Sequence, residues 1–359
     1  MILLNPGPVN LSERVRQALL RPDLCHREAE FSELQQSIRA KLLEIYDLDP
    51  GRWAAVLLSG SGTAAVEAML TTLVPPHGKV LIIENGVYGE RLSRIAEIHH
   101  IDHQRLSYPW GEGIELAAVE TCLEHRGDLT HVAVIHHETT TGRLNRLADI
   151  GALCRRRHID LLIDGVSSFG AEELDFRSWG IAACAATVNK CLHGVPGVSL
   201  VIVRRDVLPA LSAPKRTLYL DLETYCRNQD EGSTPFTPAV QCFYALDEAL
   251  EELRAQGGWR ARHESYRELA DRAREGFVSL RIQPLLRRED ASVVLNAFHL
   301  PYGLSYEGFH DRLKENGFVI YAGQGILAKS IFRVSTMGAI GRQEVERLIA
   351  VVNKIMVKD

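Results

Sequence analysis

The sequence predicts an α/β protein with a mostly parallel sheet, followed by a smaller α+β unit. From residue 52 to about 204, apolar strand-like runs alternate with helix-like segments, and each strand-like run is continuous. Continuous apolar runs are typical of strands that helices cover on both faces, and such alternation is typical of parallel sheets. From residue 292 the segments become strand, helix, strand, strand and helix, which indicates a separate α+β unit.

The expected elements follow in chain order. The strand-like runs of the first part are WAAVLLSG, KVLIIENG, HVAVIHHE, DLLIDGVSS, AACAATVN and SLVIVRR, and the helix-like segments between them are SGTAAVEAMLTTLV, GERLSRIAEIHH and LADIGALCRRRH. A loop-rich passage at about 211–238 precedes two helical segments at 241–258 and 267–280, the first stopped by two glycines. In the last part we expect strands at SVVLNAFHLP, FVIYAGQ and SIFRVSTMG, and helices at FHDRLKENG and RQEVERLIAVVNKIM.

Composition favours an enzyme-sized globular protein. Of 359 residues, 46% are hydrophobic and 24% are charged, close to the globular average. A net charge of −5 gives no electrostatic reason to expect nucleic acid or an anionic membrane as a partner. No run approaches the roughly 20 apolar residues of a membrane span, and the start, MILLNPGPVN, lacks the basic region of a signal sequence.

Cysteine and histidine usage points away from disulfides and metals. The seven cysteines are scattered without a CxxC pair, which favours reduced thiols in a cytoplasmic protein and gives no zinc signature. Neighbouring His and Glu residues, as in HHE at 136–138, lack the i, i+4 spacing of a helical metal site. We therefore expect no bound metal.

One lysine lies between two strand-like runs. In ATVNKCLHGVPGVSLVIVRR, residues 186–205, Lys190 follows one run, and a loop rich in Gly and Pro leads into the next. A lysine at a strand end can simply reach into solvent. It can also form a Schiff base with a carbonyl compound. The sharp turn at HGVPG would allow both flanks to be strands while the lysine tip faces a ligand.

Further candidates follow the other strands, where ligands bind in open α/β sheets. SGSGT at 59–63 could present N–H groups and hydroxyls to a phosphate, or could simply cap a helix. Tyr88, in an expected Gly-flanked loop, could lie against a planar cofactor or be an ordinary loop tyrosine. The threonines at 139–141 could supply hydroxyls to a ligand or be turn residues.

Asp164 ends a strongly apolar strand-like run. A carboxylate there needs a partner, and a protonated ring nitrogen would supply a charge-assisted hydrogen bond, although aspartates at strand ends also close turns. A phosphate cradle, a planar aromatic ring, a carboxylate and a lysine at successive strand ends together describe a pyridoxal phosphate (PLP) site.

These motifs resemble those of the class V, fold-type I PLP aminotransferases. The likeness runs from LLNPGPVN through SGSGTAAVEAML, NGVYGER, HHETTTGRLN, DGVSSFG, NKCLHGVPGVSLVIVRR, LYLDL, FTPAVQ and GFVIY to FRVSTMG. It implies a mostly parallel seven-stranded sheet with helices on both faces, within a large PLP-binding domain of residues 16–245. It also implies a small α+β domain of residues 1–15 and 246–359.

The resemblance assigns roles around the cofactor. It implies that Lys190 forms the Schiff base with PLP, that Asp164 pairs with the pyridine nitrogen, and that Val166 packs against the ring. Tyr88 would stack on the other ring face, and Thr139 would bond the ring hydroxyl. The residues implied for the phosphate are Ser61, Gly62, Thr63 and Asn189.

Two further residues extend the implied site. Thr237 matches a position that reaches the phosphate in the partner subunit, which implies a homodimer with shared sites. Arg333 matches the arginine that binds the acidic group of the substrate, a role that its planar fork suits. An ordinary surface arginine is the alternative, although SIFRVS places Arg333 inside an apolar strand.

The segments ETTTG, SSFG and NKCLHGVPG are most similar to the branch of the family that acts on 2-aminoethylphosphonate. This implies a ping-pong transfer of the amino group from 2-aminoethylphosphonate to pyruvate, giving phosphonoacetaldehyde and L-alanine. LCHREAEF at 24–31 departs from the acidic, tryptophan-containing segment of that branch. An alternative is therefore alanine or serine as donor, with glyoxylate or pyruvate as acceptor. A protein that keeps the fold without activity is a third hypothesis.

Overall fold

The main sheet has seven strands. The computed structural model describes residues 1–125 and 127–357. Its main sheet has the order β2-β10-β9-β8-β5-β3-β4, in which only β10 runs antiparallel to its neighbours. The strands are β2 (Trp53–Gly60), β3 (Lys79–Glu84), β4 (Asp102–Ser107), β5 (His131–Ile135), β8 (Asp160–Asp164), β9 (Ile181–Thr187) and β10 (Gly197–Arg204). The predicted α/β class with a mostly parallel seven-stranded sheet is confirmed.

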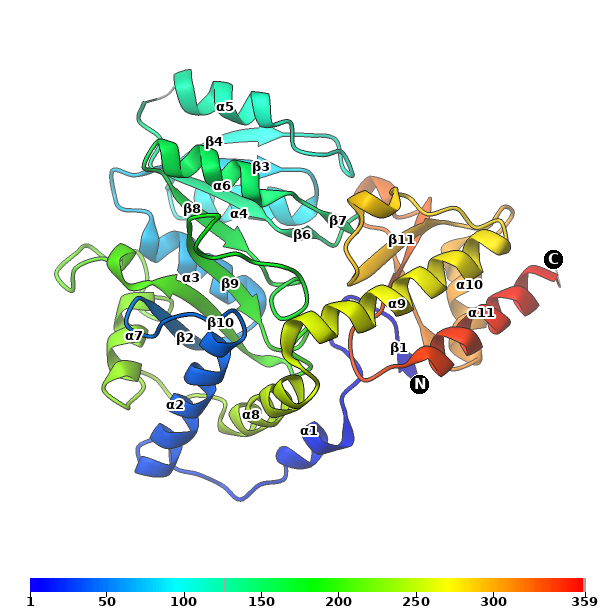
Figure 1. The fold of residues 1–359 in the computed structure, drawn as a ribbon, viewed down its shortest axis with the longest axis horizontal. Helices are drawn as coiled ribbons and strands as arrows, with labels where there is room; N and C mark the ends of the chain where they lie inside the picture. The colour runs from blue at the N-terminus through cyan, green and yellow to red at the C-terminus, as the bar shows by residue number, and fades with distance from the viewer. Residues whose placement is uncertain (126, 358–359) are drawn as a thin grey trace.

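Helices cover both faces of this sheet (Figure 1). One face packs against α3 (Gly62–Leu73), α4 (Val87–Ile98) and α7 (Leu222–Asp230). The other packs against α2 (Ala29–Glu44), α5 (Leu116–His125), α6 (Leu147–Arg156) and α8 (Val240–Ala255). Because both faces are covered, the central strands are buried almost throughout, which explains their continuous apolar runs.

Three elements of the main sheet region, the strand β4 and the helices α2 and α5, were not predicted, and one loop prediction was wrong. The strand β4 lies at the sheet edge, where all residues of its polar sequence DHQRLS are exposed or half-buried, so it carries no apolar run. The helix α5, which follows it, was also missed. Within the expected loop-rich passage, the chain forms α7, whose first turn is capped by the Asp221 side chain accepting from the Thr224 N–H group.

The C-terminal part forms a second, smaller sheet. Its antiparallel order is β11-β14-β13, built from β11 (Leu295–His299), β13 (Tyr321–Ala322) and β14 (Ile331–Ser335). A core of mostly aromatic and aliphatic side chains joins it to α9 (Gly258–Ser279), α10 (Tyr306–Glu315) and α11 (Arg342–Val357). The run FVIYAGQ is divided between two strands of different sheets, β12 (Phe318–Val319) and β13, rather than forming the single strand expected.

The N-terminal segment lies beside this C-terminal part. The strand β1 (Ile2–Leu3) pairs in parallel with β12, and α1 (Glu13–Ala18) packs against α8. The helix α9 reaches from the main sheet region to the smaller sheet (Figure 1). The predicted domain boundaries, 16–245 against 1–15 with 246–359, stay a prediction. The remaining elements are the hairpin of β6 (His137–Glu138) and β7 (Arg143–Leu144), and the short 3-10 turns η1 (Arg205–Val207), η2 (Arg288–Asp290) and η3 (Gly325–Leu327).

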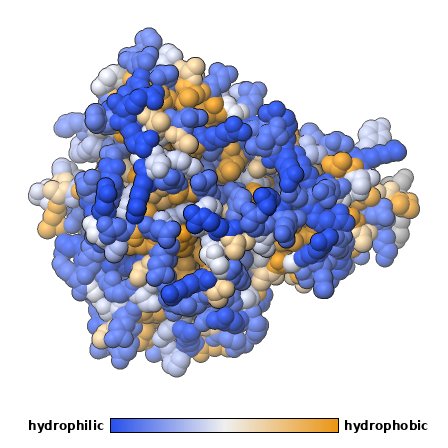
Figure 2. Space-filling model, in the orientation of Figure 1, coloured by the Kyte–Doolittle hydropathy of each residue, from blue (hydrophilic) through white to orange (hydrophobic). Residues whose placement is uncertain are grey.

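The surface is mainly polar on the face shown in Figure 2, with hydrophobic side chains in small scattered groups. Among residues 1–125 and 127–357, no helix is long and apolar enough to cross a membrane. All seven cysteines are unpaired thiols.

Candidate active site

The carboxyl ends of five parallel strands meet at one edge of the main sheet. In the register of the sheet, Asp164 at the end of β8 lies beside Ile135 of β5 and Ala185 of β9. The strand ends and the segments that follow them carry most of the predicted cofactor residues: Ser61, Gly62, Thr63, Tyr88, Thr139, Asp164, Val166, Asn189 and Lys190. The topology therefore gathers along one edge the residues that the sequence placed at separate strand ends.

Lys190 is buried at this edge. Its side chain lies in the turn after β9, and the residue is only 9% exposed, so the alternative that it reaches into solvent is wrong. Its Nζ donates a 2.8 Å hydrogen bond to Ser167 Oγ and lies 5.7 Å from the centroid of the Tyr88 ring. The N-terminal segment covers its aliphatic stem, because a Cβ added to Gly7 would lie 3.2 Å from Lys190 Cγ. A primary amine is thus held inside the protein, between a hydroxyl and an aromatic face.

Asp164 closes a turn with one of its oxygens. Its Oδ1 accepts a 2.9 Å hydrogen bond from the Val166 N–H group, and no hydrogen bond to its other oxygen is made by the described residues. Burial raises the pKa of Asp164, against the lowering effects of the Val166 N–H group and the charges of Lys190 and Arg91. A buried carboxyl with a spare oxygen is suited to a cationic partner, such as a protonated ring nitrogen.

The N-terminus of α3 offers an anion site. Ser61 occupies the N-cap position without a side-chain capping bond, and the N–H groups of Gly62 and Thr63 open the helix, where they have no partner within it. Gly62 lies so close to the loop after β8 that an added Cβ would come within 2.7 Å of Val166 Cγ1. Thr63 Oγ1 accepts a 3.1 Å bond from Arg91 Nη1, which brings a positive charge to the same place. Free N–H groups, a helix dipole and a cation together fit a phosphate.

Tyr88 lies in a helix and not in the expected loop. It is the second residue of α4, which begins at Val87 directly after the N-cap Gly86. Its ring faces the Arg91 guanidinium, with the carbon Cζ 4.7 Å from the ring centroid. The predicted Gly-flanked loop is therefore wrong. Gly86 is the N-cap of α4, and Gly89 lies within the helix, where it fits closely against Glu84.

Thr139 presents an unpartnered hydroxyl. The residue is fully buried, and its Oγ1 has no hydrogen-bond partner among the described residues. Its carbonyl oxygen accepts a 2.8 Å bond from Arg333 Nη1. A buried hydroxyl without a partner is costly, so Thr139 Oγ1 is suited to a polar group of a ligand, as the assignment to a cofactor ring hydroxyl requires.

Arg333 is a buried cation that pairs with no carboxylate in the described part of the chain. It lies in β14 and is 3% exposed, so the alternative of a surface arginine is wrong. Its Nε donates to Ala322 O at 2.9 Å, and its Nη1 donates to Thr139 O and to Gln324 Oε1. No carboxylate among the described residues forms an ion pair with it, and burial lowers the pKa of the guanidinium. Its Nη2 group makes no hydrogen bond within the described protein, so the fork can bind an added anion.

Two predicted residues are less closely tied to this group. Asn189 precedes Lys190, and its Oδ1 accepts a 2.7 Å bond from Thr187 Oγ1. Thr237 is exposed in the loop between α7 and α8, and within the described part of this chain no hydrogen bond joins it to another predicted site residue. The loop itself is anchored beside the end of β2, where the Ala239 N–H group donates to Ser59 Oγ at 3.0 Å.

Two neighbours of the site, Ser167 and Arg91, were not predicted from the sequence. Ser167 is the hydrogen-bond acceptor of Lys190, and it stands within the DGVSSFG motif that already gave Asp164. Arg91 lies three residues after Tyr88. Had Tyr88 been placed on a helix, the i, i+3 spacing would have put Arg91 on the same face.

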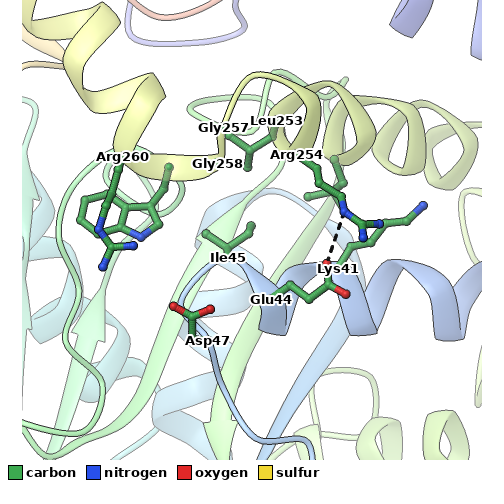
Figure 3. A pocket seen from close by; sticks show the side chains of 11 residues that line it. Lys41, Glu44, Ile45, Asp47, Leu253, Arg254, Gly257, Gly258 and Arg260 are labelled. Carbon is green, nitrogen blue, oxygen red and sulfur yellow. Dashed lines mark ion pairs between the residues drawn. The ribbon is translucent and has the colours of Figure 1, made fainter.

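One cavity lies away from these residues. Figure 3 shows a cavity of about 290 Å³ between the end of α2 and the junction of α8 with α9, where Arg254 faces Glu44 at 4.0 Å. None of the predicted site residues lines it. In the described part of the chain, no cluster of His, Cys, Asp or Glu could hold a metal ion.

The residues at the sheet edge fit pyridoxal phosphate. The fit rests on the orphaned Thr139 hydroxyl, the open N-terminus of α3, the spare oxygen of Asp164 and the buried amine of Lys190. These are partners for a ring hydroxyl, a phosphate, a ring nitrogen and an aldehyde, respectively.

Comparisons with known proteins agree with this fit. A family model described as aminotransferase class-V matches residues 16–348. The chain is 34% identical over 358 residues to a 2-aminoethylphosphonate–pyruvate transaminase of Phocaeicola vulgatus, covering 99% of this chain and 98% of the relative. It is 35% identical to the enzyme of the same name from Vibrio vulnificus, covering 99% and 97%. Among solved structures, an alanine–glyoxylate aminotransferase from Nostoc sp. superposes with a TM-score of 0.92 at 28% identity, covering 99% of this chain and 95% of that one.

Proposed function

The chain belongs to the class V aminotransferases, and from that premise we propose that it transfers the amino group of 2-aminoethylphosphonate to pyruvate, giving phosphonoacetaldehyde and L-alanine. It is a PLP-dependent aminotransferase with the fold of the fold-type I enzymes. The relatives named for this activity cover nearly the whole chain at about one third identity, which supports the choice of donor and acceptor.

We assign the cofactor contacts as the sequence motifs suggest. Lys190 would hold the aldehyde carbon, Asp164 the ring nitrogen, and Thr139 Oγ1 the ring hydroxyl. Tyr88 and Val166 would lie on opposite faces of the ring. The phosphate would be bound by Ser61, Gly62, Thr63 and Asn189.

The protein's own groups then do three things. When bound, PLP supplies an electron sink for the carbanion that forms as the amino-bearing carbon loses a proton. Lys190 Nζ, as a neutral amine, takes that proton and holds it within the site, where Ser167 Oγ at 2.8 Å fixes the position of the amine. Asp164 would place a carboxylate beside the ring nitrogen, and the covering N-terminal segment at Gly7 limits the access of water to the lysine.

Arg333 carries the substrate assignment. It is a buried guanidinium with no carboxylate partner within residues 1–125 and 127–357, and its Nη1 donates to Thr139 O, beside the hydroxyl assigned to the cofactor. A phosphonate and the carboxylate of pyruvate both match its planar fork. One arginine could therefore serve the two substrates in turn, as a ping-pong reaction requires.

A second candidate keeps the site and changes the donor. Alanine or serine would donate to glyoxylate or pyruvate, an activity that the HREAEF segment and the likeness to an alanine–glyoxylate aminotransferase favour. The carboxylate of such a donor would bind Arg333 in the same way.

We also infer a homodimer and a cytoplasmic location. In the dimer, the exposed Thr237 would reach the phosphate bound by the partner subunit, which explains why it has no site partner within one chain. Seven unpaired thiols support a reducing compartment.

A matched substrate panel tests the proposal. Purified holoenzyme is given 2-aminoethylphosphonate with pyruvate, and separately alanine or serine with glyoxylate, and the amino acid products are quantified. We expect the phosphonate pair to have the highest kcat/KM. Faster transfer from alanine or serine would select the second candidate, and no transfer from any pair would contradict both.

A further inference from the structure

The first turn of α4, which carries Tyr88, has no cap of its own. Its N-cap residue is Gly86, which has no side chain to accept from the free N–H groups of the turn. Partners come instead from the loop after β5. Val87 N donates to Thr140 Oγ1 at 3.0 Å, and Gly89 N donates to Glu138 Oε2 at 3.2 Å. A distant segment therefore satisfies the N–H groups on both sides of Tyr88.

Glu138 is a fully buried carboxylate that uses both oxygens as acceptors. Its Oε1 accepts from Thr140 N at 3.1 Å and from Thr140 Oγ1 at 2.5 Å, while Oε2 accepts from Gly89 N. No ion pair to Glu138 occurs among the described residues, so three donors, two N–H groups and one O–H group, satisfy its carboxylate. Thr140 acts as a relay, since its hydroxyl accepts from Val87 N and donates to Glu138.

The contact is closely fitted. A Cβ added to Gly86 would lie only 2.3 Å from Glu138 Cδ, so the carboxyl packs directly on the backbone at the start of α4. A negative charge at this position also interacts favourably with the N-terminal end of the helix dipole. The requirement for a glycine at position 86 follows from the presence of Glu138.

The same three-residue segment also faces the cofactor site. Thr139 lies between Glu138 and Thr140, and its hydroxyl is the buried, unpartnered one. Tyr88 lies between the two N–H groups that Thr140 and Glu138 bind, and its ring faces Lys190 Nζ at 5.7 Å. One short segment thus sets the position of two of the proposed cofactor contacts.

We propose that Glu138 and Thr140 are positioning residues that hold Tyr88 in place for stacking on the cofactor ring. The inference rests on the proposed function, because it takes Tyr88 as a ring contact. Glu138→Gln replaces one acceptor oxygen by an NH₂ group that would face N–H or O–H donors, and Thr140→Val removes the relay hydroxyl while keeping the shape of the side chain.

The experiment compares these variants with wild type and with Thr140→Ser, which restores the hydroxyl. Hydrogen exchange of the apoprotein is followed over residues 85–92, and PLP affinity is measured by titration of the apoprotein. We expect faster exchange in that segment for Glu138→Gln and Thr140→Val, PLP binding weaker by about tenfold from one buried unsatisfied donor, and near-normal values for Thr140→Ser. Glu173→Gln, on an exposed side chain, is the control.

A double-mutant comparison with Tyr88→Ala distinguishes an effect on the position of Tyr88 from a general loss of protein stability. In a Tyr88→Ala background, Glu138→Gln and Thr140→Val should weaken PLP binding little further, because the ring that they position is gone. An equal loss in both backgrounds, or unchanged exchange over residues 85–92, would overturn the proposal. Wild-type protein that binds no PLP would instead contradict the proposed function, so the two failures are distinguishable.

Discussion

Lys190 Nζ donates a 2.8 Å hydrogen bond to Ser167 Oγ, and both residues are buried at the carboxyl edge of the main sheet. The serine belongs to the loop that begins at Asp164, so this bond joins the two segments that carry the proposed lysine and carboxylate. Ser167 is thereby the residue that directs the lysine amine within the site.

Ser167→Ala should slow amino transfer while leaving cofactor content unchanged. Without the hydroxyl, the amine loses its acceptor, and we expect a fall in the single-turnover rate of about tenfold. Ser167→Thr, which keeps the hydroxyl, should lose much less. Equal rates for wild type and Ser167→Ala, measured by stopped-flow absorbance of the bound cofactor, would show that Ser167 does not direct Lys190.

Arg333→Lys should weaken the use of both substrates. The lysine keeps the charge but cannot bond Ala322 O, Thr139 O and an anion together. Loss of about 2–3 kcal/mol of charge-assisted bonding should lower kcat/KM about a hundredfold for 2-aminoethylphosphonate and for pyruvate. Arg342→Lys, at an exposed position, is the control. A loss confined to one substrate would contradict the shared anion site.

Gly62→Ala should harm both the fold and cofactor binding. The new Cβ would lie 2.7 Å from Val166 Cγ1 and 3.3 Å from Thr187 Cβ, so either the start of α3 or the loop after β8 must move. Overpacking of this kind costs about 1–3 kcal/mol. Gly127→Ala, where an added Cβ meets nothing within 4 Å, is the matched control. Denaturant unfolding of the apoprotein and PLP titration measure the two effects, and equal behaviour of the two variants would refute the close fit.

Buried histidines should make the protein less stable in mild acid. Burial lowers the pKa values of His136 and His137 to about 4, against 6.5 for an ordinary histidine. Between these values the unfolded chain binds protons that the folded protein does not. Stability is therefore present above pH 6.5 and is lost as the pH falls toward 4, by roughly 3 kcal/mol for each histidine.

His137→Asn isolates one of these contributions. The asparagine amide can still donate to Ser167 O, as His137 Nδ1 does at 3.0 Å, but it does not titrate. The free energy of unfolding of the variant should fall less steeply from pH 7 to 4.5 than that of wild type. Burial raises the pKa values of Asp164 and Glu138, so these two carboxyls favour the folded state as the pH falls, opposite to the histidines. Both carboxyls are present in the variant and in wild type, so their contribution cancels when the two slopes are compared. His125→Asn, at an exposed site, should leave the slope unchanged.

Subunit mixing tests the proposed role of Thr237. Lys190→Ala and Thr237→Asp proteins should each be inactive, the second because a carboxylate would face the cofactor phosphate. In a mixed dimer, one of the two sites would be intact. That site would combine Lys190 of the Thr237→Asp chain with Thr237 of the Lys190→Ala chain. Activity should therefore return when the two variants are unfolded and refolded together. If Thr237→Asp is fully active alone, or if no activity returns although mixed dimers form, the shared site is contradicted.

The strand ends could be predicted because they combine two local signals. Continuous apolar runs marked the buried strands, and the polar residues that follow them include Asp164 and Lys190. The edge strand β4 carried no such signal, because its polar residues face solvent. Tyr88 was assigned to a loop because its helix is capped by Glu138 and Thr140, far away in the sequence. Contacts of this kind depend on the folded arrangement, so neither the cap nor the Ser167 bond to Lys190 could be derived from sequence spacing.

The half-reaction without an acceptor tests whether Lys190 serves a PLP site for 2-aminoethylphosphonate. Holoenzyme is mixed with this donor alone, and aldehyde release and cofactor absorbance are followed, with Lys190→Ala protein beside it. We expect about one phosphonoacetaldehyde per active site before pyruvate is added, then the same amount of alanine, and neither product from Lys190→Ala. Holoenzyme that releases no aldehyde from 2-aminoethylphosphonate, or Lys190→Ala protein that turns over like wild type, would contradict this role of Lys190.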